Sequence, residues 1–347
     1  MKNKYTHSAW LAGLLIILSS LVTGCSDSSE PDVQQGRPLQ VNMTRSDSEE
    51  ETPVQIGTQI CLWLVQSDDT KQSGYVTYAG KDANKKDVWN SGVFVEGSKT
   101  YYIYGYMPSK LVDGSDITAT KDGNVVTGAT LKLEGLKVLS KEDFSIVIGV
   151  KAGEDGTVRR GDFSYTAEAE NNGITLLVDH LYAGASFKMN INAEYNKLRT
   201  IKLKKMELVC TDPQMRSKVN ATITFRNGLT NPVNSITTNR DADADEAKQT
   251  LFEDAEGIEL TEAESVIDAM NFLPTFASSL ALFSTYDVYD KKGNLIRENC
   301  TATNKLTGIL SGIQRGQIRP VLLTVNPTYI YVLSEPDLDK PDLVIGN

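Results

Sequence analysis

Short apolar runs bounded by turn residues recur along almost the whole chain, and they constrain the fold more than any other feature. Apolar and polar residues alternate within many of them, as in a strand with one face toward a core. Only Glu262–Asn271 and, less clearly, Asp245–Phe252 have a helical pattern. We therefore predict an all-β chain, with strands at Val54–Val65, Gly74–Tyr78, Lys99–Met107, Ala129–Leu133, Phe144–Val150, Ile174–Val178, Ala185–Ile191, Leu198–Cys210, Val219–Phe225, Leu280–Tyr289 and Val321–Leu333.

The length of the chain predicts more than one domain. A chain of 347 residues is too long for one small domain and suits two. Many short strands at close spacing are typical of β-sandwiches. The polar stretch Ala167–Gly173 separates the two halves, so we expect sandwiches over residues 46–170 and 171–347. The segment Lys291–Asn294 predicts a hairpin turn after the strand Leu280–Tyr289.

The N-terminus has the pattern of a bacterial lipoprotein signal. Lys2 and Lys4 precede an apolar run, Ala9–Val22, which is short for a membrane-spanning helix and suits a secretory signal. The run leads into Leu21–Cys25, which resembles a lipobox. We therefore predict a signal peptide over residues 1–24 and lipidation of Cys25. Each methylene of the acyl chains that enters the membrane would contribute about 0.8 kcal/mol to the free energy of membrane binding.

Charge and composition exclude several classes of function. The net charge of −10 argues against nucleic-acid binding, which requires a basic surface. The chain has two histidines, His7 and His180, and His7 lies in the predicted signal peptide. A histidine-based catalytic triad or a multi-histidine metal site in the body of the protein could therefore use His180 alone. We expect His180 to be a hydrogen-bonded structural group. The sequence contains no GxSxG, HExxH, Walker or GxGxxG motif, so we predict no catalytic residue, no metal, no cofactor and no enzyme.

An acidic segment imitates part of a calcium loop. Asp241, Asp243 and Asp245 have the spacing of its first half. Glu246 replaces the glycine at the sixth position, however, and Phe252 replaces the glutamate at the twelfth. We interpret the segment as a solvated acidic loop.

Two further patterns have ordinary explanations. Arg160–Asp162 spells an integrin-type tripeptide, which three residues match easily by chance. Tyr102, Tyr104 and Tyr106 share one strand face, which could stack sugar rings but is predicted to belong to the core.

The cysteines beyond Cys25 give no metal or redox motif. Cys61, Cys210 and Cys300 are far apart and lack CxxC or zinc spacing. An exported chain could pair Cys210 with Cys300, but buried free thiols are the favoured interpretation.

One segment near the N-terminus does not fit a simple linker. In Leu39–Arg45 the apolar residues alternate strictly, with Leu39, Val41 and Met43 on one face. The polar segment Ser46–Glu51 follows directly and is expected to leave Arg45, just past the strand, open to a protease. This arrangement suits a removable strand within the pro-segment 25–45. The alternative is a first edge strand followed by a loop.

The order of these features resembles the fimbrillins, the lipoprotein pilins of Bacteroidales type V fimbriae. The resemblance extends over nearly the whole mature chain. In this family Phe often stands directly before the histidine, where this chain has Val178 and Asp179. The matching features are the lipobox at Cys25, the strand ending at Arg45, Trp89 followed by Tyr101–Pro108, then Leu177–Leu181, Tyr286–Asp290, Gly293–Arg297 and Val325–Leu333.

The resemblance implies two transthyretin-like β-sandwiches in tandem and a structural function. Such a subunit reaches the cell outer membrane as a lipoprotein. An arginine-specific protease then removes the anchor and the first strand, here after Arg45. A strand from another fimbrial subunit fills the vacated groove, and repetition of this contact builds a fimbrium that supports cell adhesion. Stalk, tip and anchor roles remain open.

The resemblance also implies a donor strand near the C-terminus. One candidate face carries Tyr329, Tyr331 and Leu333; the other stretch is Leu343, Val344 and Ile345. The sequence does not rank them. A second class of function is a surface glycan-binding lipoprotein. It would require exposed aromatic platforms, and the tryptophans left after signal removal, Trp63 and Trp89, both lie within strand-like runs.

Overall fold

The computed structural model describes residues 36–45, 54–153, 157–168, 172–212, 215–329 and 336–345, and within these the chain is almost entirely strand. The described helical segments are short: α1 (Ala193–Asn196) and the 3-10 turns η1 (Ser109–Leu111) and η2 (Pro274–Ser279). None of them is long and apolar enough to cross a membrane. The prediction of an all-β chain is confirmed.

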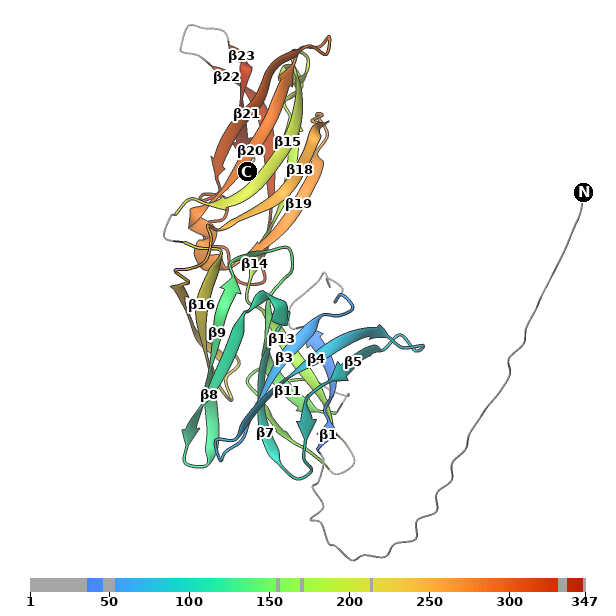
Figure 1. Ribbon diagram of the computed structural model, residues 1–347, viewed down its shortest axis with the longest axis vertical. Coiled ribbons are helices and arrows are strands. Elements are labelled where there is room, and N and C mark those ends of the chain that lie inside the picture. Colours follow the sequence, from blue (N-terminus) through green and yellow to red (C-terminus); the bar gives the residue numbers. More distant parts are fainter. Residues whose placement is uncertain are drawn as a thin grey trace, which may run out of the picture. The chain divides into compact units, whose positions relative to one another are not determined.

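The largest sheet contains most strands of the first half of the chain (Figure 1). Its order is β2-β13-β11-β7-β3-β4-β5, and β12 also pairs with β7. The sheet begins at one edge with the N-terminal strand β2, which lies beside a strand more than 130 residues away in sequence. Its members are β2 (Gln40–Arg45), β3 (Gln59–Val65), β4 (Lys71–Lys81), β5 (Asp87–Ser91), β7 (Thr100–Met107), β11 (Ser145–Ala152), β12 (Ser164–Thr166) and β13 (Gly173–His180).

This sheet curls until its two edges approach each other. The short strands β1 (Arg37–Pro38) and β6 (Phe94–Val95) pair across the gap, and β2 also lies close to β5. The concave face encloses an apolar core of its own, to which Leu62, Ile103 and Leu176 contribute. We call this the slot core, because the segment 36–45 covers it.

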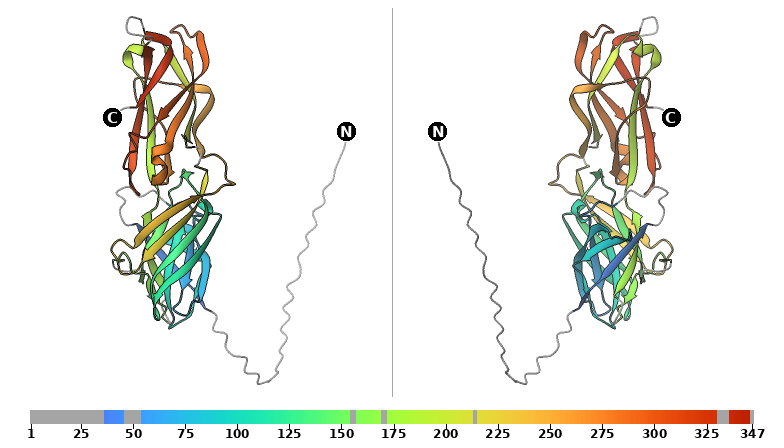
Figure 2. Two further views of the ribbon diagram at one scale, coloured as in Figure 1. Left: turned by 90° about the vertical axis from the view of Figure 1, so that its left-hand side faces the viewer. Right: turned by 90° about the vertical axis from the view of Figure 1, so that its right-hand side faces the viewer.

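The opposite face of the same sheet packs on a four-stranded sheet with the order β17-β16-β9-β8 (Figure 2). The two faces meet through residues such as Tyr104, Ile148, Leu131 and Phe225. The strands are β8 (Gly114–Asp122), β9 (Val125–Lys137), β16 (Lys218–Arg226) and β17 (Val233–Arg240).

The strand pairing does not follow the predicted division at residue 170. β13 lies beyond that point but pairs with β11 in the large sheet, and β16 pairs with β9, also from the first half. The reason is that two apolar faces far apart in sequence complete one layered core, which the polar stretch at 167–173 does not reveal.

The remaining strands form two further sheets. One has the order β10-β19-β14-β22-β23 and the other β18-β15-β20-β21, and their apolar faces share one core. The strands are β10 (Leu139–Ser140), β14 (Ala183–Ile191), β15 (Thr200–Cys210), β18 (Lys248–Glu259), β19 (Ser265–Phe272), β20 (Leu280–Tyr289), β21 (Leu295–Lys305), β22 (Ile318–Tyr329) and β23 (Pro336–Ile345).

The two helical predictions are wrong. Most of Glu262–Asn271 is the strand β19, which pairs with β14, and the end of Asp245–Phe252 opens β18, which pairs with β15. Backbone hydrogen bonds between strands override a weak local helical pattern. The hairpin prediction is confirmed: Gly293 has a φ of 86° and donates its N–H to Asp290 O at 3.1 Å between β20 and β21.

Candidate functional site

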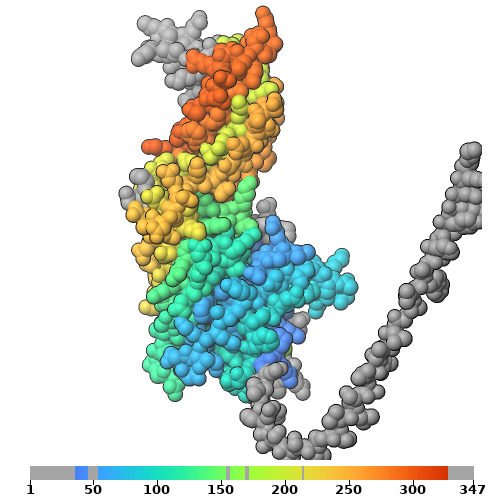
Figure 3. Space-filling view, in the orientation of Figure 1, coloured from blue at the N-terminus to red at the C-terminus, as the bar shows by residue number. Residues whose placement is uncertain are grey.

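The segment 36–45 lies between two strand edges. β1 pairs antiparallel with β6, and β2 pairs parallel with β13. Between them Leu39 N donates to Val93 O at 2.8 Å, and Gln40 N donates to Asn172 O at 3.0 Å. The side-chain amide of Asn172 also donates to Pro38 O. The segment therefore changes strand partner at Leu39 and closes a groove, which we call the slot. In Figure 3 part of this dark blue segment is visible at the surface.

Alternate side chains of this segment fill the slot. Leu39 is 0% exposed, Val41 is 5% exposed, and Met43 is half-buried against the same core. Gln40 and Thr44, on the opposite face, are exposed. The slot is lined by Ile60, Leu62, Leu64, Val93, Val95, Ile103, Ile174, Leu176 and Val178, among others.

Among the described strands, one long ladder, to β13, holds β2. Its partners run in register from Gly173 opposite Gln40 to Val178 opposite Arg45, and its other long side faces the gap that β1 and β6 bridge. Burial of a Leu or Val side chain contributes about 1.5–3 kcal/mol. Burial of apolar side chains therefore supplies most of the free energy that keeps the strand in place. Loss of the strand would leave both an apolar groove and an unpaired edge on β13.

Arg45 is the last residue of β2, and it is half-buried opposite Val178. The Ser46–Glu51 segment lies outside the described residues. A protease needs an extended, unpaired backbone, so cleavage after Arg45 requires this end of β2 to open first.

Charged groups surround the end of the slot at His180. His180 Nδ1 lies 2.6 Å from Asp143 Oδ2, and Ser145 Oγ donates to the same carboxylate oxygen at 2.9 Å. The bond to Asp143 raises the pKa of the imidazole; partial burial and the charge of Arg45 act in the opposite direction. Asp179, the neighbouring residue, pairs with Arg160 at 3.4 Å. The hydrogen bond to Asp143 gives His180 the structural role expected of it.

The two predicted donor stretches occupy different places in one sheet. Tyr329 is the last residue of β22, an interior strand between β14 and β23. Leu343, Val344 and Ile345 lie in β23, the edge strand of this sheet, whose pairing partner among the described strands is β22. Tyr331 and Leu333 lie outside the described residues, as does the predicted lipidation site Cys25.

Sequence reasoning missed half of the slot. The strand β6 is two residues long and gives no periodic signal, yet Val95 lies opposite Arg37 and is buried in the slot core. β13 was predicted as a strand, but not as the partner of β2. That partnership is a parallel pairing of residues about 130 positions apart in the sequence, which local alternation does not reveal.

Two other sequence patterns lie within the described residues. Among these residues no group of His, Cys, Asp and Glu side chains could hold a metal ion. In the tripeptide at Arg160, Arg160 pairs with Asp179 and Gly161 is buried, with a Cβ there only 2.3 Å from Leu229 O, whereas Asp162 is exposed.

The aromatic side chains are mostly part of the packing. Tyr104 and Tyr106 are buried in the core, where Tyr104 stacks on Phe163 at 4.6 Å. Trp63 is partly buried and donates its indole N–H to Ser115 Oγ at 3.1 Å, and Trp89 packs on Tyr78 at 4.9 Å beside the slot core. Both rings are partly buried, and Lys71 Nζ lies 5.7 Å from the centre of the Trp63 ring.

The three described cysteines are free thiols. Cys210 lies opposite Leu280 and Cys300 opposite Tyr286 along β20. Six residues of strand place these positions about 20 Å apart, well beyond the reach of a disulfide.

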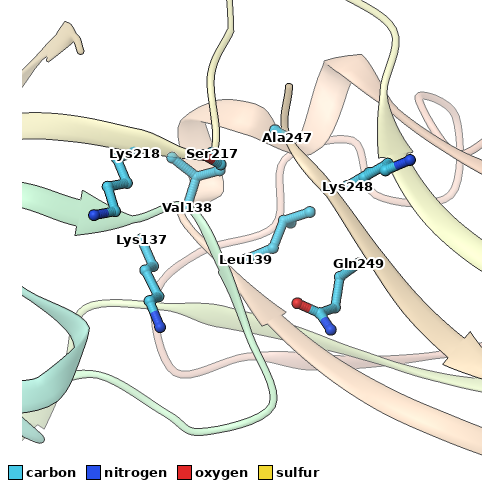
Figure 4. A pocket seen from close by; sticks show the side chains of 8 residues that line it. All are labelled: Lys137, Val138, Leu139, Ser217, Lys218, Ala247, Lys248 and Gln249. Carbon is cyan, nitrogen blue, oxygen red and sulfur yellow. The ribbon is translucent and has the colours of Figure 1, made fainter. Parts of the chain in front are cut away.

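A small pocket of about 180 Å³ is lined in part by three lysines (Figure 4). Lys137 and Lys218 point to one side of it and Lys248 points away to the other. Lys218 is already paired with Asp113 at 2.6 Å. An anion needs several convergent donors, and these amines do not provide them.

The chain is structurally similar to fimbrial and candidate adhesion proteins of Bacteroides over about 90% of its length. A fimbrial protein from Bacteroides vulgatus matches with 14% identity and a TM-score of 0.48, over 90% of this chain and 98% of the other. A candidate cell adhesion protein from Bacteroides fragilis matches with 12% identity and a TM-score of 0.43, over 90% and 97%. One from Bacteroides uniformis matches with 9% identity and a TM-score of 0.42, over 91% and 98%. No protein-family model and no curated protein matches the sequence.

Proposed function

We propose that this protein is a structural subunit of a fimbrium, exported as a lipoprotein on Cys25, matured by cleavage after Arg45 and polymerised by strand exchange in support of cell adhesion. The observation that carries the proposal is the way β2 is held. The segment 36–45 seals an apolar core with Leu39 and Val41, yet among the described strands its β2 has a single long ladder, to β13. Removal of this segment breaks the short β1-β6 pair and takes the edge strand from the large sheet, and it leaves the pairing within the other sheets intact.

Removal of the segment 36–45 would expose an apolar groove to which another strand can bind. The slot core would be open to water, and the backbone groups of β13 and β6 that now bind residues 37–45 would lack partners. An exposed apolar groove with an unpaired strand edge is a template for strand addition. A second copy of the chain, or another fimbrial subunit, supplies the strand.

The topology favours β23 as the donor over the stretch that contains Tyr329. β22 lies between two strands, so its departure would break the sheet, whereas within the described part of the chain β23 pairs with β22 at the sheet edge. Leu343 and Ile345 alternate along β23, as Val41 and Met43 do along β2. The contact joins different surfaces of successive copies, so it propagates a filament.

Cleavage position provides a sharp test. The precursor is produced without the signal peptide and with Cys25→Ser, treated with an arginine-specific protease and followed by size-exclusion chromatography and non-denaturing electrophoresis. We expect wild-type protein to form ladders. Arg45→Ala and a chain truncated after Ser334 are expected to stay monomeric.

Arg37 offers a matched control. It is exposed in β1, and a cut there would leave β2 attached to the body. Arg37→Ala should therefore polymerise like the wild type. Polymerisation of Arg45→Ala at the wild-type rate would show that removal of the strand is not the trigger.

A further inference from the structure

The end of the slot places an arginine and a histidine on the same face. Val41 lies opposite Ile174 and Met43 opposite Leu176, and all four contact the slot core. The register continues to Arg45 opposite Val178. Because alternate residues of a strand point to the same side, His180 shares this face with Val178, and therefore with Arg45.

The separation is small enough for the two charges to interact. One strand spacing across and two residues along place the two β-carbons about 8 Å apart. Both side chains are partly buried rather than fully solvated, so their interaction is screened less than that of two exposed charges.

We propose that His180 and Asp143 form a proton-dependent latch on the end of β2, in which protonation of His180 weakens the hold on Arg45 and opens the following peptide bond to the protease. The inference rests on the proposed function, since the latch matters only where cleavage after Arg45 matures the subunit.

The charged groups that contact or flank His180 are two carboxylates and an arginine. Asp143, two residues before β11, accepts its ring N–H, and Asp179 on β13 accepts its backbone N–H at 3.0 Å while it pairs with Arg160. The loop before β22 brings the uncharged Gly316 against the ring; a Cβ there would lie 3.4 Å from Cδ2. The next charge on that loop is Arg315. The added positive charge of the imidazolium is therefore the change that Arg45 experiences.

The coupling has a definite sign. The charge of Arg45 lowers the pKa of His180, although the bond to Asp143 has the larger, opposite effect. By reciprocity a proton on His180 must disfavour the docked state of Arg45. The end of β2 therefore opens more often at pH 6 than at pH 8, while the His180–Asp143 pair itself becomes stronger at pH 6.

The test is the rate of cleavage after Arg45 in the full precursor at pH 6 and pH 8. Each rate is divided by the rate for a free peptide of residues 41–50, which removes the pH dependence of the protease. Unit charges about 8 Å apart change an equilibrium by about twofold in water and by about 30-fold at the effective dielectric constant of a protein surface, so the ratio should be higher at pH 6 by a factor between these two values. His180→Gln should give the same ratio at both values.

Three variants complete the design. Arg45→Lys, cut by a lysine-specific protease, keeps the charge and should keep the pH effect. Lys188→Gln removes an exposed charge in a different sheet and should also keep it. Asp143→Asn should move the midpoint of the effect to lower pH, and it serves as the second test if His180→Gln folds poorly.

The outcome is independent of polymerisation. An equal ratio at pH 6 and pH 8 in the wild type, or an unchanged pH effect in His180→Gln, would overturn the latch. Either result could occur in a protein that still polymerises after cleavage, and a working latch could occur in one that does not, so the two proposals fail separately.

Discussion

The contribution of Leu39 to the hold on β2 can be predicted from its burial. Its side chain is completely buried in the slot core, whereas the neighbouring Gln40 is exposed on the opposite face. Truncation of a buried leucine to alanine costs about 2–5 kcal/mol when the cavity cannot collapse. Leu39→Ala should therefore weaken the binding of the cleaved segment by at least roughly 30-fold, whereas Gln40→Ala should change it by less than about threefold.

The measurement is the release of the segment after cleavage. A fluorescent label on the N-terminus of the Cys25→Ser precursor follows the segment as it leaves the body, and anisotropy reports the rate. Wild type, Leu39→Ala and Gln40→Ala are compared at one protein concentration, so that displacement by other copies is the same in each. If Leu39→Ala releases the segment no faster than Gln40→Ala, apolar burial at Leu39 does not hold the strand.

Three further outcomes follow from the same geometry. Trp89 packs against the slot core, so removal of residues 25–45 from the precursor without its signal peptide, which also lacks Trp10, should shift tryptophan emission to longer wavelength; the shift should vanish in Trp89→Phe, and persistence there would assign it to Trp63 instead. The raised pKa of His180 gives stability that is full below the unfolded pKa of about 6.5 and is lost as pH rises through the higher folded value. Chemical denaturation should therefore show the wild type losing stability relative to His180→Gln between pH 6 and pH 8, and a gain would contradict this sign. Cys210 and Cys300 are free and far apart, so the double serine variant should have the wild-type melting temperature with or without reductant, and a drop seen only without reductant would reveal a disulfide.

The strand content was predictable because it depends on local alternation. The strands β3, β7, β11 and β13 were predicted within a few residues of their bounds, apart from an early start for β3, because each carries a buried apolar face over its whole length. Largely exposed strands such as β17 gave no such signal. β18 and β19 were missed as strands because only their pairing with β15 and β14 distinguishes them from helices.

The sequence by itself determined that Leu39, Val41 and Met43 would share one face of a strand that ends in an arginine. A period of two is a property of the backbone alone, so no partner was needed to see it. Only the tertiary structure decided what that face covers. The slot is made by β6 and β13, about 55 and 130 residues further along the chain, and it closes because a curled sheet brings its own edges together. The place of Arg45 inside the ladder and the neighbourhood of His180 are consequences of that closure, since a parallel register between distant strands leaves no trace in local sequence.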